Sequence, residues 1–177
     1  VISMMREDYQ EDIRQHFDRT PAAAFAYREA AEIKTQVRTV RHFLIAEDEG
    51  KSSHPYCVKW TDHPDKGYST LILASRDRPL LLEKLCCSLA SEQINILSAD
   101  LFTRTDNIVL NMFRVCTTNF EPISNIATRN RFIHTLTTIF KAENYEPEDY
   151  LKRKINCLKP RTETGVSIPV RAHVSND

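Results

Sequence analysis

The sequence predicts an α+β fold in which a four-stranded antiparallel sheet carries two helices on one face. Short runs in which apolar and polar residues alternate predict the strands. Stretches in which apolar residues recur every three or four positions predict the helices. The length of 177 residues suits one compact domain with appendages, because a domain typically has about 100–200 residues.

The first 50 residues are expected to be helical. Residues 1–17 place apolar side chains near a 3.6-residue spacing, and Thr20-Pro21 is expected to cap and begin a second helix that reaches about Ala46. The second helix carries a narrow apolar seam formed by Ala26, Ala30, Ile33, Val37, Val40 and Leu44. Such a seam is typical either of a coiled-coil dimer or of a helix packed on its own domain, and the sequence leaves both open.

A hairpin and a helix are expected next. Tyr56, Val58 and Trp60 alternate with polar or small residues in a strand over 55–61, and the turn cluster 62–67 leads into a strand over 68–75. Asp77-Arg78-Pro79 is expected to open the following helix, either simply as a helix start or as a turn that presents amide groups and Arg78 to a ligand. The buried stripe of this helix is expected to be Leu81, Leu82, Leu85, Cys86 and Leu89.

Two more strands and a helix complete the expected core. The strand over 94–103 places Leu97, Ala99 and Leu101 on one face, and after the turn 105–107 the strand over 108–116 is partly apolar on both faces. A further element should therefore cover the second face of the sheet. A helix over 125–142 follows. The order β-α-β-β-α, with strand 55–61 beside the first core strand, predicts a ferredoxin-like sheet completed from its N-terminal side.

Composition and motifs argue against several classes of function. The chain has five cysteines without a CxxC motif, which indicates free thiols in a cytoplasmic protein, and the scattered histidines predict no metal site. It has neither a phosphate-binding glycine loop nor a nucleophile elbow, so we expect no cofactor and no catalytic residue. The balance of 24 basic against 24 acidic residues, with no long apolar run, predicts no nucleic-acid or membrane partner. The basic residues around 152–161 fit a solvated linker better than an RNA-binding patch.

Three segments together resemble the ACT domain, a regulatory module that commonly binds amino acids. They are the turn Asp77-Arg78-Pro79-Leu80-Leu81-Leu82, the strand INILSADLFT at 94–103, and the strand NMFRV at 111–115. With the helices before them, they resemble more closely the first of two ACT domains in bacterial protein-PII uridylyltransferases. The resemblance divides the chain into a helical connector at 1–50, an ACT domain at 51–160, and the start of a second ACT repeat at 161–177.

The resemblance implies a regulatory fragment without catalytic residues, whose parent enzyme carries nucleotidyltransferase and HD domains upstream. The implied ligand is an amino acid, with glutamine favoured, and the implied partners are a PII-type protein, through the parent enzyme, and a second ACT domain or a second copy of the chain. The implied ligand-binding residues are Asp77, Arg78, Pro79, Leu80, Asn95, Ile96 and Leu97.

Two departures from the family pattern leave an alternative open. Leu80 stands where ligand-binding ACT domains usually carry a glycine that lets backbone amides approach the ligand, and Asn111 replaces a usual aspartate. The alternative is a ligand-free ACT-like module that docks another protein. Asn95, Ile96 and Leu97 would then be no more than a helix–strand connection.

Overall fold

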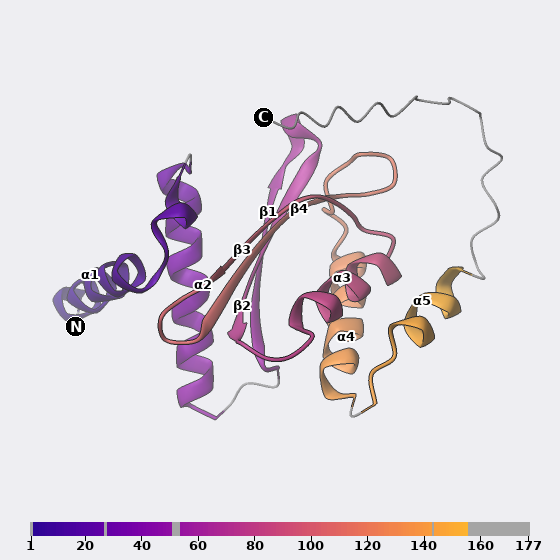
Figure 1. Cartoon of the computed structure of the whole chain (residues 1–177). Helices are drawn as coiled ribbons and strands as arrows, with labels where there is room; N and C mark the ends of the chain where they lie inside the picture. Colours follow the sequence, from indigo (N-terminus) through magenta and orange to yellow (C-terminus); the bar gives the residue numbers. More distant parts are fainter. Residues whose placement is uncertain (1, 27, 51–53, 143, 156–177) are drawn as a thin grey trace, which may run out of the picture.

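The computed structural model describes residues 2–26, 28–50, 54–142 and 144–155 (Figure 1). The predicted second repeat at 161–177 lies outside these ranges. The elements are α1 (Ile2–Arg19), the 3-10 turn η1 (Ala22–Phe25), α2 (Ala30–Asp48), β1 (Tyr56–His63), the 3-10 turn η2 (Pro64–Lys66), β2 (Tyr68–Arg76), α3 (Leu81–Ser91), β3 (Asn95–Thr103), β4 (Ile108–Cys116), α4 (Ile126–Lys141) and α5 (Pro147–Ile155).

The four strands form one antiparallel sheet in the order β1-β2-β4-β3. β1 pairs along its whole length with β2, from Tyr56 opposite Ser75 to His63 opposite Tyr68. The predicted hairpin is therefore confirmed, and β1 occupies the edge position that a closing fourth strand would take. The α+β architecture is compatible with the predicted ferredoxin-like core.

One face of the sheet packs against α3 and α4 (Figure 1). Leu71, Leu73 and Phe113 of the sheet lie in a buried cluster with Leu85 of α3 and Phe132 of α4, each of them fully buried. The alternation that predicted these strands therefore points their larger apolar side chains into this core.

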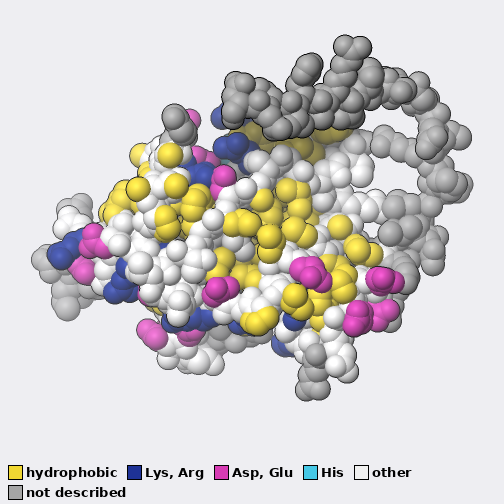
Figure 2. Space-filling view, viewed as in Figure 1, with side chains coloured by type: hydrophobic (Ala, Val, Ile, Leu, Met, Phe, Trp, Pro, Cys, Tyr) yellow, Lys and Arg dark blue, Asp and Glu magenta, His cyan; other side chains and the backbone are white. Residues whose placement is uncertain are grey.

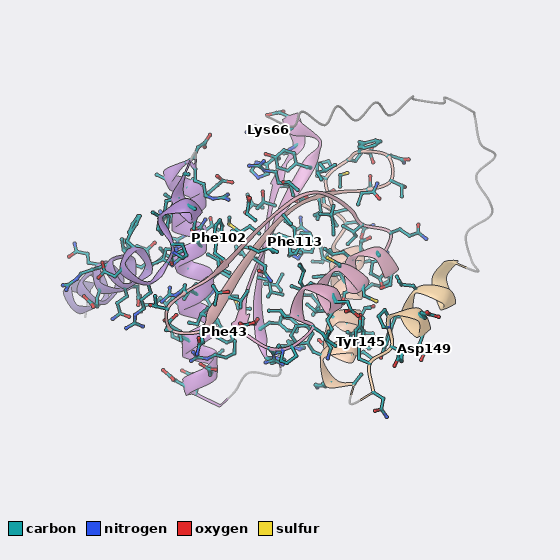
Figure 3. The ribbon with its side chains drawn as sticks, viewed as in Figure 1. Phe43, Lys66, Phe102, Phe113, Tyr145 and Asp149 are labelled. Carbon is teal, nitrogen blue, oxygen red and sulfur yellow. The ribbon has the colours of Figure 1, made fainter. Side chains whose placement is uncertain are left out.

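The other face of the sheet packs against α2, so the sheet lies between two helical layers (Figure 1). Val40 and Phe43 of α2 form a second buried cluster with Ile72, Leu110 and Met112. Figure 3 shows Phe43 and Phe102 on the α2 side of the sheet, whereas Phe113 lies on the side of α3 and α4. The second apolar face of β4 is thus covered from within the chain, and the seam of α2 packs on its own domain.

The predicted start of the second helix at Thr20-Pro21 is wrong. Pro21 has an extended ψ of 139°, and α2 begins only at Ala30, after the turn η1. Tertiary contacts explain the interruption: Ala24 is fully buried, and the Phe25 ring lies 4.5 Å from the ring of Phe17. Burying Ala24 and packing Phe25 against Phe17 outweigh the helix propensity of the alanines. Ala26 and Ala30, predicted members of the seam, are consequently exposed.

The start of α3 also differs from the prediction. The helix begins at Leu81, so that Asp77-Arg78-Pro79 precedes it as a connection, and Leu80 occupies the N-cap position. Leu81, Leu85 and Leu89 are buried as predicted, but Leu82 is 43% exposed. Leu82 is one position, about 100°, round the helix from Leu81 and lies away from the buried stripe.

Candidate functional site

A hollow of about 330 Å³ lies where the connection before α3 meets the end of β3. It is lined by Asp77, Arg78, Leu80, Leu81, Leu82, Glu83, Leu101, Phe102, Thr103, Val109 and Asn111. The pairing of β3 with β4 explains this set, because Leu101 lies opposite Asn111 and Thr103 lies opposite Val109 on the α3 side of the sheet. Its volume is near the lower end of the range for small-molecule sites.

Arg78 is the cationic residue in the lining of this hollow. Its Nε is buried and has no hydrogen-bond partner among the described residues. The guanidinium lies over the Phe140 ring, 5.2 Å from the centroid, so the ring holds its position without using its donors. A buried donor without an acceptor is costly, and an anionic ligand would relieve that cost.

Leu80 occupies the N-cap position of α3 and borders the same hollow. Leu80 has φ 60° and ψ 16°, a left-handed conformation that costs an L-residue about 1–2 kcal/mol, and it makes no side-chain hydrogen bond to cap the helix. The first N–H groups of a helix have no intrahelical partners, and they attract anions. Glycine would adopt this conformation without strain, so the backbone at residue 80 retains the geometry that a glycine would favour.

Acidic and amide groups complete the lining. Asp77 and Glu83 supply carboxylates beside Arg78, and Asn111 supplies an amide from a side chain that is only 2% exposed. Cationic and anionic groups thus face the same hollow. This arrangement suits a zwitterion better than a simple anion, because each charge of the ligand would meet an opposite charge.

The chain brings together only part of the predicted ligand site. Asp77, Arg78 and Leu80 line the hollow, whereas Pro79 is not among the lining residues. Asn95, Ile96 and Leu97 lie at the other end of β3, where Asn95 pairs with Cys116. The lining residues on β3 and β4 were missed by sequence reasoning, although the register of these two strands would have pointed to them.

β3 and the beginning of α3 expose large apolar side chains. Leu80 (54% exposed), Leu82 (43%) and Leu101 (43%) line the hollow, whereas Ile96 (39%) and Leu97 (49%) lie towards the other end of β3. In Figure 2, hydrophobic side chains cover the middle of the view, where Figure 1 places β3 and the beginning of α3. The predicted shared face of Leu97, Ala99 and Leu101 is interrupted by a bulge between Ile96 and Ser98.

A buried polar network joins the end of β3 to the N-terminal helices. His16, 0% exposed, lies between Gln36 of α2 (Nε2 to Oε1, 3.2 Å) and Arg104 in the β3–β4 turn (Nδ1 to Nη1, 3.1 Å). Arg104 donates two further bonds to Asp106, at 3.0 and 2.8 Å, and Arg19 of α1 donates another at 3.0 Å. Three segments of the chain, α1, α2 and the β3–β4 turn, are therefore held together by one network.

The network fixes the protonation state of His16. Arg104 can only donate, so Nδ1 of His16 must accept, and the proton on Nε2 is donated to Gln36. Burial lowers the pKa of His16 below its usual value of 6.5, and the nearby charge of Arg104 lowers it further, while the hydrogen bond to Gln36 opposes the shift. The neutral imidazole is therefore part of the folded state.

Because His16 is neutral in the folded protein, we expect the protein to lose stability in mild acid. Because the pKa of His16 is lower in the folded protein than in the unfolded chain, unfolding takes up a proton. The free energy of unfolding should be constant above about pH 6.5 and fall as the pH drops towards the folded-state pKa, by at most about 1.4 kcal/mol per pH unit. Urea denaturation at pH 5 to 8 would measure the decline.

The matched variants separate His16 from other titrating groups. His16→Gln should abolish the decline between pH 5 and 6.5, and His134→Gln, at an exposed position on α4, should leave it unchanged. An equally steep decline in His16→Gln would contradict the assignment of the proton. Asp106 and Glu47, whose pKa values are lowered, contribute only at more acidic pH.

The described ranges offer few groups for other chemistry. They contain no group of three or more side chains arranged to hold a metal ion, and each of their helices is too short or too polar to cross a bilayer. Cys57, Cys86, Cys87 and Cys116 are free, and burial raises the pKa of each thiol, so none is a ready nucleophile at neutral pH. No family model, curated protein or solved structure matches the chain.

Proposed function

We propose that this chain is a regulatory ACT-like module that senses an amino acid, with glutamine as the favoured effector. The observation that carries the proposal is the unpartnered Nε of Arg78 beside the first turn of α3, whose N-cap residue Leu80 supplies no side-chain hydrogen bond. Both groups attract a carboxylate, and they border the same hollow. Asp77 would hold the ammonium group of the ligand, and the amide of Asn111 would face its side chain.

A second copy of the chain, or a second ACT domain, would complete the site. β3 lies at the edge of the sheet and can accept another strand there. Antiparallel pairing of two β3 strands about Ala99 would place Leu97 of one copy opposite Leu101 of the other, and Asn95 opposite Thr103. The two halves of the predicted site, separate in one chain, would then meet across the interface, and the exposed leucines would be buried.

The same strand offers a route from the ligand to the N-terminal helices. While one face of β3 borders the hollow, Asp100 accepts a 2.6 Å hydrogen bond from Arg28, just before α2, and Phe102 packs against the α2 cluster. A ligand that binds more tightly to one position of β3 would also shift the equilibrium between positions of α2, because the two elements are in contact. In a cytoplasmic parent enzyme, upstream nucleotidyltransferase and HD domains would respond, and a PII-type protein would be their substrate.

Ligand-induced stabilisation tests this proposal. Glutamine at about 100 times its dissociation constant should raise the free energy of unfolding by about 2.7 kcal/mol. Arg78→Met, which removes the donors but keeps an apolar stem beside Phe140, should abolish the response, measured by urea denaturation with and without glutamine. Arg14→Met, at a side chain that is 75% exposed on α1, is the matched control and should respond as the wild type does.

A docking module is the second candidate, favoured by the exposed apolar side chains of β3 and by the leucine at position 80. A flat response to glutamine and to all other amino acids would contradict the sensing function and favour docking. Leu80→Gly sharpens the comparison, because it removes the leucine side chain from the mouth of the hollow while keeping the backbone conformation. Sensing predicts that this variant binds glutamine at least as tightly as the wild type.

A further inference from the structure

A second hollow, of about 510 Å³, lies on the opposite side of the sheet from the candidate amino-acid site. Its walls come from α1, the side of α2 that adjoins the buried seam, and the edge strand β1. The polar and charged side chains that line it are Tyr9, Thr35, Arg38, Thr39, Arg41, His42 and Lys59. Its volume falls within the range of about 300–1,000 Å³ typical of sites for small organic molecules.

Positive charge is concentrated around this hollow. Arg38, Arg41 and Lys59 are cationic, and no lining residue is acidic. Arg41 is paired with Asp12, so the three cations and this one neighbouring carboxylate leave an excess of two positive charges. The chain as a whole has equal numbers of acidic and basic residues, so this excess is a local feature and not a consequence of composition.

The hydrogen-bonding groups also favour an acceptor-rich ligand. The guanidinium and ammonium groups of Arg38 and Lys59, both exposed, can only donate. The Tyr9 hydroxyl in the wall is buried and has no hydrogen-bond partner among the described residues, so the wall also contains an unpaired hydroxyl group. Thr35 already donates its hydroxyl proton to the carbonyl of Ala31, so it does not add a donor.

The residues that line the hollow fit a binding site and not a site of covalent catalysis. Cys57 is the one thiol in its lining, and burial raises the pKa of that thiol, which keeps it protonated at neutral pH. One guanidinium group can donate two parallel hydrogen bonds to the oxygens of a phosphate. A single phosphate ion would fill only a small part of 510 Å³, and Val58 supplies apolar wall for the remainder of a larger molecule.

We infer that this hollow binds a phosphate-bearing organic molecule of nucleotide size between α1, α2 and β1. The two cations that do not take part in the Arg41–Asp12 pair, Arg38 and Lys59, hold the phosphate groups. Because they come from α2 and from β1, the ligand bridges the N-terminal helices and the edge of the sheet. The site is distinct from the hollow at Arg78, so the inference stands whether or not the chain senses an amino acid.

Calorimetric titration with ATP in the absence of divalent metal tests the inference, with inorganic phosphate and citrate titrated at the same ionic strength. ATP should bind saturably and more tightly than inorganic phosphate. Arg38→Gln and Lys59→Gln should each weaken ATP binding roughly tenfold, the loss expected for one charge-assisted hydrogen bond. Both residues are exposed, so the variants should fold, and circular dichroism would check this.

Lys66→Gln provides the matched control, because Lys66 is exposed in the turn between β1 and β2, away from the hollow (Figure 3). It should bind ATP as the wild type does. Three results would each overturn the inference: no saturable binding of ATP, unchanged binding in a variant that carries both substitutions, or citrate binding as tight as that of ATP. Amide chemical shifts should change for α2 and β1 on binding and not for the first turn of α3.

Discussion

Phe43→Ala is expected to lower the free energy of unfolding by about 3–4 kcal/mol. The ring is 5% exposed and lies on α2 in the cluster that covers one whole face of the sheet. Truncating a buried phenylalanine typically costs about 3–5 kcal/mol, because the apolar transfer energy is lost and a cavity remains. We place the cost below the upper end because α2 lies at the surface of the domain and can settle towards the sheet. Urea denaturation followed by circular dichroism would measure it.

Ile45→Ala is the matched control, since Ile45 is on the same helix but 42% exposed, and it should cost less than about 1 kcal/mol. The comparison tests whether α2 unfolds together with the sheet or is a separate connector. A loss below 1 kcal/mol in Phe43→Ala would mean that α2 is a detachable connector whose packing contributes little. A single cooperative transition with a large loss would mean that any signal through α2 also acts on the sheet.

The sheet was predictable because its signals are local. Alternation in β1 and β4 and the turn cluster before β2 fixed the strands, and the need to pair strand 55–61 fixed the order of the sheet. The cover over the second apolar face was foreseen as a requirement, although the sequence left open whether the helix before the hairpin would supply it. The choice depends on contacts between Phe43 and residues about 30 to 70 positions later, such as Ile72 and Met112.

The starts of α2 and α3 were mispredicted for a common reason. Both depend on single side chains meeting distant partners: Phe25 on Phe17, and Arg78 over Phe140. Proline and cap preferences amount to about 1 kcal/mol, which such contacts can outweigh. The positive φ of Leu80 could not be anticipated from the residue itself, because leucine strongly disfavours that conformation.

Three of the eleven residues that line the candidate site were predicted from the sequence as ligand-binding residues. The turn before α3 identified Asp77, Arg78 and Leu80, all of which border the hollow. The opposite wall depends on which residues of β3 and β4 face α3, and the bulge after Ile96 alters that alternation. The buried network around His16 gave no signal at all, since its members are separated by up to 90 positions and no motif connects them.

Asp106→Ala is expected to destabilise the protein by about 3 kcal/mol. Asp106 is the acidic partner of Arg104, whose side chain is only 2% exposed. Removing one partner of a buried ion pair typically costs about 3–5 kcal/mol, because the remaining charge stays in a medium of low dielectric constant without compensation. The carboxylate itself is 21% exposed, so water can partly replace it, which places the effect near the lower end. Chemical denaturation at pH 7.5 would give the value.

The cause of that loss can be separated from simple truncation by a second substitution. In Asp106→Ala combined with Arg104→Met no buried charge remains, so the double variant should be less destabilised than the sum of the two single variants by at least about 1 kcal/mol. Asp65→Ala, in the exposed turn after β1, should stay within about 0.5 kcal/mol of the wild type. Strict additivity would show that Arg104 and Asp106 do not stabilise each other. Coupling would instead mean that an ion pair within the β3–β4 turn stabilises this turn, which Arg19 and His16 of α1 contact, next to Thr103 in the wall of the candidate amino-acid site.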